Sequence, residues 1–541
     1  MEIRANFVDI GQREIYPAKV VIEKRKIASV TKIDGPCSSY ILPGFIDAHI
    51  HIESSMLAPS EFARLAVRHG TVATVSDPHE IANVLGIEGV EFMLDNAEQV
   101  NFKFYFGASP CVPATPFETS GATLGVGEIK TLLKKPQIKY LSEVMNFPGV
   151  IDGDEELLSK IKAAQELGKP VDGHAPGLRG DDLKRYIDAG ITTDHEAFTY
   201  EEGLEKIRNG MKIVIREGSA AKNFNALEPL IDEHYAMLMF CSDDRHPNDL
   251  YHDHINALVK RALAKGNDLF KVLQIACINP ITHYDLDVGM LREGDSADFI
   301  EVDNLEDLTV LKTVINGEVV AQNGETKISR VPVSKPNRFH AVAKKAEEFA
   351  MPECKTVEVI QAVDHELITH EKVVTLRNVS SQMVGDPEHD ILKISVVNRY
   401  EDAPPAVAYV NGFGLRQGAI ASSVAHDSHN IVAVGCSDEM IARAVNLVIQ
   451  NKGGICAVSE KEELLLPLEV AGIMSAGDGF EVAGIYDDLD RMAKEKLGSV
   501  LSAPFMTLSF MALLVIPELK LSDKGLFDGR TFHFISGCRT E

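Results

Sequence analysis

Between residues 43 and about 245, short apolar runs alternate with amphipathic segments, and this rhythm constrains the fold more than any other feature. Eight of the runs have the length and composition of buried strands. They span residues 45–51, 71–77, 102–107, 138–143, 170–174, 191–194, 211–216 and 236–242. Most intervening segments carry apolar residues at spacings of three and four, which predicts helices. Eight such units in about 200 to 250 residues predict a (β/α)8 barrel; an open, doubly wound sheet is the alternative.

Strand-like alternation also occurs on both sides of the barrel segment. Residues 1–42 alternate apolar and polar side chains between turn residues. The same character returns at 288–338, where Asn316-Gly317 predicts a hairpin turn. We therefore expect a small β-sandwich domain built from both flanks, 1–42 plus 288–338, with the barrel domain at 43–287.

The remaining residues, 339–541, mix strand and helix patterns. Strands are predicted at 372–380 and 391–400 and a helix at 438–453, which favours a C-terminal α+β domain. The most apolar run, 504–521, is broken by a proline and is too short to span a membrane, so it is interpreted as core.

Composition excludes several classes of function. The net charge of −26 argues against a nucleic-acid-binding surface and favours neutral or cationic ligands or metals. No apolar run reaches about 18 residues and the N-terminus carries charges throughout, so neither a membrane span nor a secretory signal is expected. The eight cysteines are scattered without a CxxC motif, which predicts a reducing, cytoplasmic location rather than a disulfide framework.

Polar residues occur where the predicted barrel strands end, which is where barrel enzymes place their active sites. His49 and His51 end the first strand, and side chains two residues apart on a strand point the same way. The matching positions of the fourth, fifth, sixth and eighth strands hold Glu143, His174, His195 and Asp243. Four imidazoles and two carboxylates suffice for two divalent ions, with the glutamate as the bridge between them.

Taken alone, most of these residues have a structural explanation. The histidine pair of the first strand could lie in a polar loop, and His174 could be a turn residue. His195 and Asp243 could cap the helices that follow them. Glu143 is harder to explain, because a carboxylate at the end of an apolar strand needs a partner. Their joint occurrence at matching strand ends predicts a metal centre.

The segments that contain these residues resemble the amidohydrolase superfamily. PGFIDAHIH (43–51) resembles its first-strand signature, and GDSADFIEVD (294–303) resembles the signature of its closing β-sandwich. Within the superfamily, the chain most resembles the bacterial and archaeal adenine deaminases over essentially its whole length. Further segments that carry this resemblance are SDPHEIANVLG (76–86), SEVMNFPGV (142–150), DGHAPGL (172–178), CSDDRHP (241–247), HDSHN (426–430) and MSAGDGF (474–480).

This resemblance implies that the six strand-end residues are metal ligands for two divalent ions, Mn²⁺ or Fe²⁺ in the first place and Zn²⁺ in the second. It implies hydrolysis of adenine to hypoxanthine and ammonia, as in purine salvage, by a metal-bridging hydroxide that attacks C6. It also suggests a homodimer whose ligand is a small molecule rather than a nucleic acid or a membrane.

Roles for individual residues follow from that chemistry. Asp243 is expected to accept the proton of the nucleophile and to pass it to the departing amine. His79, after the second strand, is expected to polarise the site or the attacking hydroxide, beside the bridging Glu143. The residues expected to hold the edge of the purine are Glu53, Arg216, Glu217 and Ser219. For Arg216, a structural ion pair is an equal alternative.

Three other functions are alternatives to this interpretation. An amidohydrolase acting on a cyclic amide, dihydroorotase-like or imidazolonepropionase-like, is disfavoured by Glu143 in the bridging position and by the long C-terminal region. A zinc deaminase of the cytidine type requires H-x-E and P-C-x-x-C motifs, and Cys111 has no second cysteine at that spacing, so it is excluded. A non-enzymatic binding protein is disfavoured because all the strand-end ligands are present.

The C-terminal motif HDSHN contains two further histidines, His426 and His429. They could form a metal pair on one face of a helix. We favour the other interpretation, a polar loop over the barrel mouth.

Overall fold

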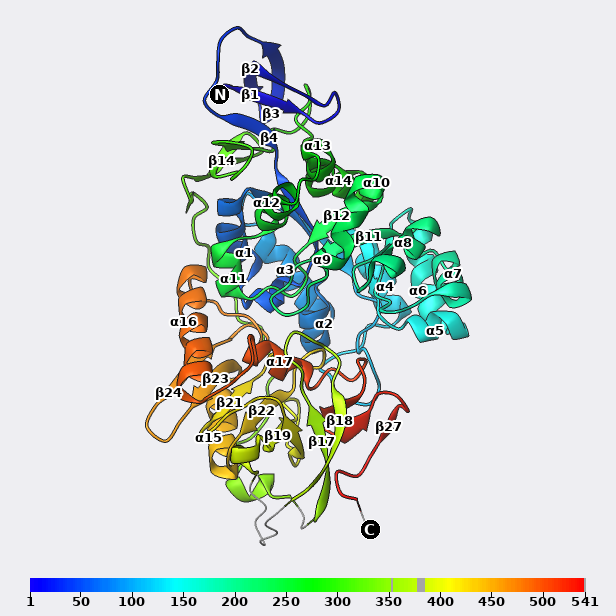
Figure 1. Cartoon of the computed structure of the whole chain (residues 1–541), viewed down its shortest axis with the longest axis vertical. Coiled ribbons are helices and arrows are strands. Elements are labelled where there is room, and N and C mark those ends of the chain that lie inside the picture. The colour runs from blue at the N-terminus through cyan, green and yellow to red at the C-terminus, as the bar shows by residue number, and fades with distance from the viewer. Residues whose placement is uncertain (352–353, 377–384, 540–541) are drawn as a thin grey trace.

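The structure is a computed structural model that describes residues 1–351, 354–376 and 385–539. Figure 1 shows three parts stacked along the long axis, with the N-terminal strands at one end, the barrel in the middle and the C-terminal region at the other end. Of the predicted strand at 372–380, residues 377–380 lie outside the described residues.

Eight parallel strands form the barrel, as the sequence predicts. They are β5 (Phe45–Ile50), β6 (Thr71–Ser76), β7 (Lys103–Ala108), β8 (Ile138–Val144), β9 (Val171–Gly173), β10 (Thr193–Asp194), β11 (Lys212–Arg216) and β12 (Leu238–Cys241). Strands β5 to β9 form one sheet and β10 to β12 another. Thr192 N donates to Val171 O at 2.8 Å across the first gap, and Asp243 N donates to His49 O at 3.0 Å across the second. These bonds close the ring, which favours the barrel over the open sheet.

Helices surround this ring, because its strands are buried on both faces and need an apolar cover. Some of them begin at a side-chain cap: Asp154 accepts from Leu157 N at 2.8 Å at the start of α6. The helices of the barrel region are α1 (Pro59–Ala66), α2 (His79–Leu85), α3 (Ile87–Ala97), α4 (Val126–Leu133), α5 (Phe147–Asp152), α6 (Glu155–Glu166), α7 (Gly180–Asp188), α8 (Tyr200–Arg208), α9 (Phe224–Leu227), α10 (Ile231–His234), α11 (Pro247–His252), α12 (Ile255–Ala264), α13 (Leu269–Leu273) and α14 (Asn279–Tyr284).

The two flanks of the barrel segment share one sheet. Its order is β16 (Glu325–Thr326), β15 (Glu318–Gln322), β14 (Val310–Ile315), β13 (Phe299–Val302), β4 (Tyr40–Pro43), β1 (Glu2–Asp9), β2 (Glu14–Glu23) and β3 (Lys26–Lys32). The join is antiparallel, with Phe299 opposite Pro43. Asn316 and Gly317 have φ of 52° and 74° and connect β14 to β15, which confirms the predicted hairpin.

The C-terminal region is built on a second eight-stranded sheet. Its order is β18 (His370–Thr375), β17 (Thr356–Gln361), β20 (Ala406–Asn411), β19 (Leu392–Val397), β22 (Ile431–Gly435), β21 (Ala419–Ser422), β23 (Gly454–Val458) and β24 (Glu463–Pro467). The predicted helix at 438–453 is α15 (Asp438–Gln450), which packs on this sheet. Two more helices and a small sheet follow, namely α16 (Gly479–Arg491), α17 (Pro504–Phe510), β25 (Leu519–Ser522), β26 (Gly525–Asp528) and β27 (His533–Phe534).

One apolar core runs from the barrel into the C-terminal region, so the two pack as a continuous body. Helix α17 lies between them (Figure 1). The run 504–521 is largely buried, as expected of core, but part of it also lines a cavity at the barrel mouth. Among the described residues, no helix has both the length and the hydropathy needed to cross a bilayer.

Candidate metal centre

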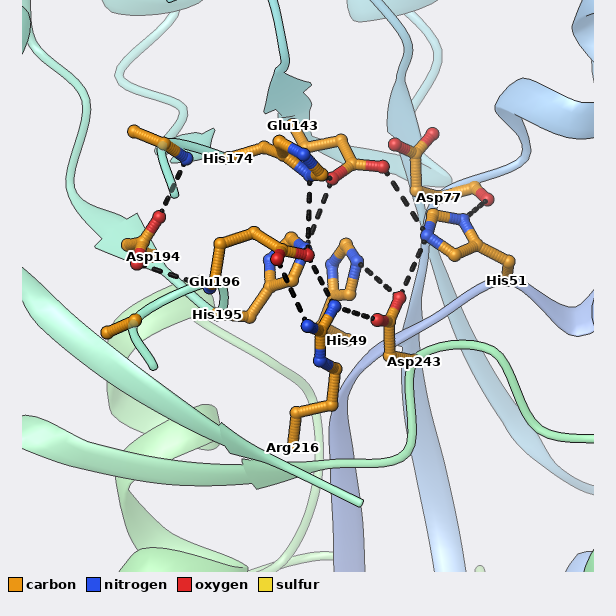
Figure 2. A network of polar contacts seen from close by, with 12 residues as sticks. His49, His51, Asp77, Glu143, His174, Asp194, His195, Glu196, Arg216 and Asp243 are labelled. Atoms are coloured by element: carbon orange, nitrogen blue, oxygen red, sulfur yellow. Dashed lines mark hydrogen bonds and ion pairs between the residues drawn. The ribbon is translucent and has the colours of Figure 1, made fainter. Parts of the chain in front are cut away.

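The six predicted ligands meet at one end of the barrel (Figure 2). Each stands at or just after the carboxyl end of its strand, because the parallel strands present these ends at the same mouth. His49 comes from β5 and His51 directly follows it; Glu143 comes from β8, and His174, His195 and Asp243 follow β9, β10 and β12. All six side chains are buried or nearly so.

Glu143 contacts histidines on two sides. Its Oε1 lies 3.4 Å from Nε2 of His51, whereas its Oε2 lies 2.8 Å from Nδ1 of His174 and 3.3 Å from Nε2 of His195. The two oxygens of one carboxylate therefore face two separate groups of imidazoles, as a bridging ligand requires.

Asp243 completes the group of ligands on the β5 side. Its Oδ1 lies 3.2 Å from Nε2 of His51 and 3.6 Å from Nε2 of His49. Its backbone has φ of 53°, and its N–H donates to the carbonyl of His49. The same contact that closes the barrel thus brings this carboxylate to the histidine pair.

The donor set fits divalent metal ions. Donor atoms of His49, His195 and Asp243 lie within 4.8 Å of one another, and so do those of Glu143, His174 and His195. Both ring nitrogens of His49 are buried without a hydrogen-bond partner. A buried imidazole in that state lacks its expected partner, and a cation supplies one. Imidazole and carboxylate ligands without thiolate suit manganese, iron or zinc.

The electrostatics of the cluster are those of a cation site. Burial opposes ionisation of Glu143, but the charge of His174 and the hydrogen bond from it outweigh burial and hold the pKa of this carboxyl well below its usual range. Burial likewise opposes protonation of His174, yet Glu196 and Glu143 raise its pKa to about 9. Glu143 thus remains ionised and attracts positive charge.

Arg216 is buried between two carboxylates. It donates through Nη1 and Nη2 to Glu196 in a bidentate pair, and its Nη1 also donates to Oδ2 of Asp243 at 2.6 Å. Burial opposes the charge of Arg216, but Glu196 and Asp243 hold its pKa above its usual range. The arginine lines the cavity, and the structural ion pair that is its alternative role is present.

His79 begins α2 beside the predicted ligands. Its Nδ1 lies 3.3 Å from Oδ2 of Asp77 and 3.4 Å from Oε1 of Glu143. Its Nε2 lies 3.2 Å from Oε1 of Glu80. Burial opposes protonation, but the charges of Glu80 and Asp77 outweigh it and hold the pKa of His79 well above its ordinary value.

Three of the four residues predicted to hold the purine do not line this cavity. Glu53 accepts from Ile81 N at 3.2 Å and so supports the start of α2; burial raises its pKa to about 7. Glu217 pairs with Arg261 at 2.9 Å, and Ser219 donates to Asp249. Glu217 does not line the cavity because side chains alternate along a strand. Arg216 points inward, so the residue after it points outward.

The C-terminal region supplies the far wall of the cavity. It contributes Leu367, His426, Asp427, Phe510, Leu513 and Ile516. His426 and His429 lie in the loop between β21 and β22, in agreement with the favoured loop interpretation of HDSHN.

Several site residues were not assigned from the sequence. Glu80 and Glu196 directly follow His79 and His195, so their position next to strand-end histidines was an available signal. The apolar wall carried no such signal, because Phe510 and its neighbours have the pattern of ordinary core.

A larger cavity, of about 590 Å³, lies between the N-terminal sheet and the end of the barrel opposite the metal cluster. Tyr16, Tyr235 and Met290 are among its walls, and its described lining residues include no histidine. The chemistry of the chain is therefore assigned to the smaller cavity.

Comparison with known proteins identifies the family of the chain. A model described as the amidohydrolase family matches residues 40–320, and one described as the adenine deaminase C-terminal domain matches residues 366–533. A curated relative named adenine deaminase, from Sulfurovum sp. (strain NBC37-1), is 68% identical and covers 100% of both chains. Relatives of the same name from Salinibacter ruber and Methanosarcina acetivorans are 56% and 50% identical, each over 98% of both chains.

Proposed function

The chain belongs to the adenine deaminase family of amidohydrolases, and from this premise we propose that it hydrolyses adenine to hypoxanthine and ammonia at the barrel mouth. In this reaction a C6–O bond forms from water, the C6–N bond breaks, and the amine leaves as ammonia. The barrel supplies the reacting groups, and the C-terminal region supplies the opposite wall of the site.

The observation that carries the proposal is the position of Glu143, whose two oxygens face separate groups of histidines. We propose that it would serve two divalent ions, with Mn²⁺ or Fe²⁺ as the first choice and Zn²⁺ as the second. The residues that would hold the ions are His49, His51, Glu143, His174, His195 and Asp243. When bound, such ions lower the pKa of a coordinated water and make it nucleophilic at neutral pH.

Asp243 is the proton carrier in this proposal. Its pKa is held well below the usual range because Arg216 and the neighbouring histidines outweigh the effect of burial, so it is ionised and able to accept a proton. Arg216 donates to Oδ2 and Oδ1 faces the histidines of β5, so the carboxylate has a fixed position at the metal cluster, where it would take the proton from the attacking water. The carboxyl group then delivers the proton to the exocyclic nitrogen, which leaves as ammonia rather than as an amide anion.

His79 and Arg216 have supporting roles. His79 lies beside Glu143, where its ring polarises the site as charge develops on the purine. Arg216 acts through Asp243, whose orientation it fixes, rather than as a direct contact of the purine edge. We further propose that the enzyme acts as a cytoplasmic homodimer in purine salvage.

The direct test is an assay of the purified chain, loaded in turn with Mn²⁺, Fe²⁺ and Zn²⁺, on adenine, adenosine, guanine and a panel of cyclic amides. Ammonia and hypoxanthine from adenine are expected, with the highest rate for Mn²⁺ or Fe²⁺. Hydrolysis of a cyclic amide by a metal-loaded enzyme that ignores adenine would refute the proposal. Light scattering at enzyme concentrations used in the assay tests the dimer.

A further inference from the structure

The loop between β21 and β22 brings three acid–base side chains of the C-terminal region to the barrel mouth. His426, Asp427 and His429 are 4%, 3% and 1% exposed, so each must be paired within the protein or with a ligand.

The two histidines are both paired with one residue of the barrel. Oε1 of Glu80 lies 2.5 Å from Nδ1 of His426 in an ion pair, and Oε2 of Glu80 accepts a hydrogen bond from Nε2 of His429. Ala425 N donates to Nδ1 of His429 at 3.2 Å, so the proton of that imidazole is on Nε2 and points at Glu80. One carboxylate of the barrel thus fixes both ends of the segment that contains Asp427.

Two residues of the C-terminal region, Arg399 and Tyr400, also donate hydrogen bonds to this loop. Arg399, fully buried, donates to the carbonyl of His429 at 3.3 Å, and its own N–H donates to Oδ1 of Asn430 at 3.0 Å. Tyr400 donates to the carbonyl of Ser428 at 2.5 Å. Asp427 therefore has a defined position that does not depend on a substrate.

Asp427 itself is left incompletely paired. Its Oδ1 lies 3.6 Å from Nε2 of His79, beyond hydrogen-bond distance, and its Oδ2 is buried with no partner. A buried carboxylate oxygen without a donor is costly, so a ligand that brings an N–H to it gains a charge-assisted hydrogen bond. Asp427 lines the same cavity as the metal ligands.

The position of Asp427 determines which N–H group of adenine can donate a hydrogen bond to it. Adenine has donors at the C6 amine and at the single ring N–H of its five-membered ring. The amine is at the reacting carbon, beside Glu143 and Asp243. The imidazole of His79 separates Glu143, next to Nδ1, from Asp427, next to Nε2. Asp427 therefore faces the half of the purine that points away from the reaction.

Resting on the proposed function, we propose that Asp427 is a substrate-binding residue that accepts the ring N–H of free adenine. Phe510, Leu513 and Ile516 provide the apolar surface next to it, on which a purine ring packs. A nucleoside or an N-methyl purine lacks this N–H and would leave the carboxylate buried and unpaired. The site therefore binds these analogues more weakly than adenine, both because the hydrogen bond is missing and because the added substituent is larger.

The test compares adenine with 9-methyladenine on the Mn²⁺-loaded wild type and on Asp427→Ala and Asp427→Asn. For Asp427→Ala, kcat/KM on adenine should fall about 10- to 100-fold, mainly through KM, with metal content unchanged. The ratio of kcat/KM for adenine to kcat/KM for 9-methyladenine should fall by the same factor. Asp427→Asn keeps an acceptor oxygen and should be intermediate. The surface variant Asp488→Ala is the control and should match the wild type.

An alanine variant that keeps the full preference for adenine would overturn the proposal, since it would assign the discrimination to the apolar wall alone. If Asp427→Ala fails to fold or to load metal, the Asn variant decides: an unchanged preference overturns the proposal, and a preference narrowed several-fold supports it. Wild-type enzyme that releases no ammonia from adenine would refute the proposed function instead, so the two failures are distinguishable.

Discussion

Arg216 donates to Oδ2 of Asp243 at 2.6 Å, which leaves Oδ1 of the same carboxylate facing the histidines of β5. The arginine also binds Glu196 through both of its terminal nitrogens. A guanidinium is suited to this position because its planar fork reaches two carboxylates at once. The arginine thus fixes the orientation of Asp243, with Oδ2 on the guanidinium and Oδ1 toward the histidines of β5.

The first prediction concerns this arginine. Arg216→Met should destabilise the protein by about 3 to 5 kcal/mol, because two buried carboxylates lose their counter-charge. Arg216→Lys should be less destabilising but should lower kcat at least tenfold, since an ammonium does not reproduce the forked contact. Thermal unfolding and steady-state kinetics measure the two effects. Arg261→Met removes a half-exposed partner of Glu217 and should change the stability by less than about 1 kcal/mol. Equal effects of the two methionine variants would contradict this role.

The second prediction separates metal binding from proton transfer. Asp243→Asn should retain bound metal but lose about 10²- to 10⁴-fold in kcat, because the amide does not accept the proton of the attacking water. Metal analysis and an ammonia-release assay check the two halves of this statement. The adjacent Asp244→Asn is a matched control, because Asp244 lines the same cavity but accepts from Ser54. Full activity of Asp243→Asn would remove this residue from the mechanism.

The third prediction tests the bridge. Glu143→Gln should lower the metal content from two ions to one or fewer per chain, because a neutral amide does not serve two cations. Glu53→Gln is the control, since this equally buried glutamate supports α2 outside the cluster and should leave both ions bound. Metal analysis after dialysis gives the result. Two ions retained by the Glu143→Gln variant would show that Glu143 does not bridge.

The sequence predicted the barrel and the metal cluster because both depend on local patterns. His49 and His51 follow from strand alternation, and the other ligands follow from the rule that parallel strands end at one mouth. The pairing of Glu80 with His429 was not predictable in this way, because 349 residues separate them and only the docking of the C-terminal region brings them together. Glu217 and Ser219 follow a strand that does end at the mouth, but the chain turns outward there, with Gly218 N bonded to Ala221 O.

Long-range hydrogen bonds also position the apolar wall of the cavity. Lys520, on β25 and fully buried, donates from Nζ to the carbonyl of Leu367 at 2.7 Å and to that of Phe510 at 3.0 Å. Both carbonyls belong to residues that line the cavity. Among the described residues, no carboxylate is paired with the amine of Lys520. Burial therefore favours the neutral amine and lowers the pKa of Lys520 to about 7.

The fourth prediction is a pH dependence of stability that originates at Lys520. Between about pH 7 and pH 10.4 the unfolded chain binds a proton at this residue and the folded chain does not, so the free energy of unfolding rises with pH by about 1.4 kcal/mol per unit. Below pH 7 both states are protonated and the cost of burying the charge is constant.

Lys520→Met lacks this dependence. Its stability relative to the wild type should therefore be highest and constant below about pH 6.5 and fall by about 2 kcal/mol from about pH 7.0 to about pH 8.5. Thermal midpoints at these pH values measure the change, with the exposed Lys524→Met as a control that should not vary. A difference between Lys520→Met and the wild type that is the same at both ends of this range would show that the buried amine is already charged throughout it.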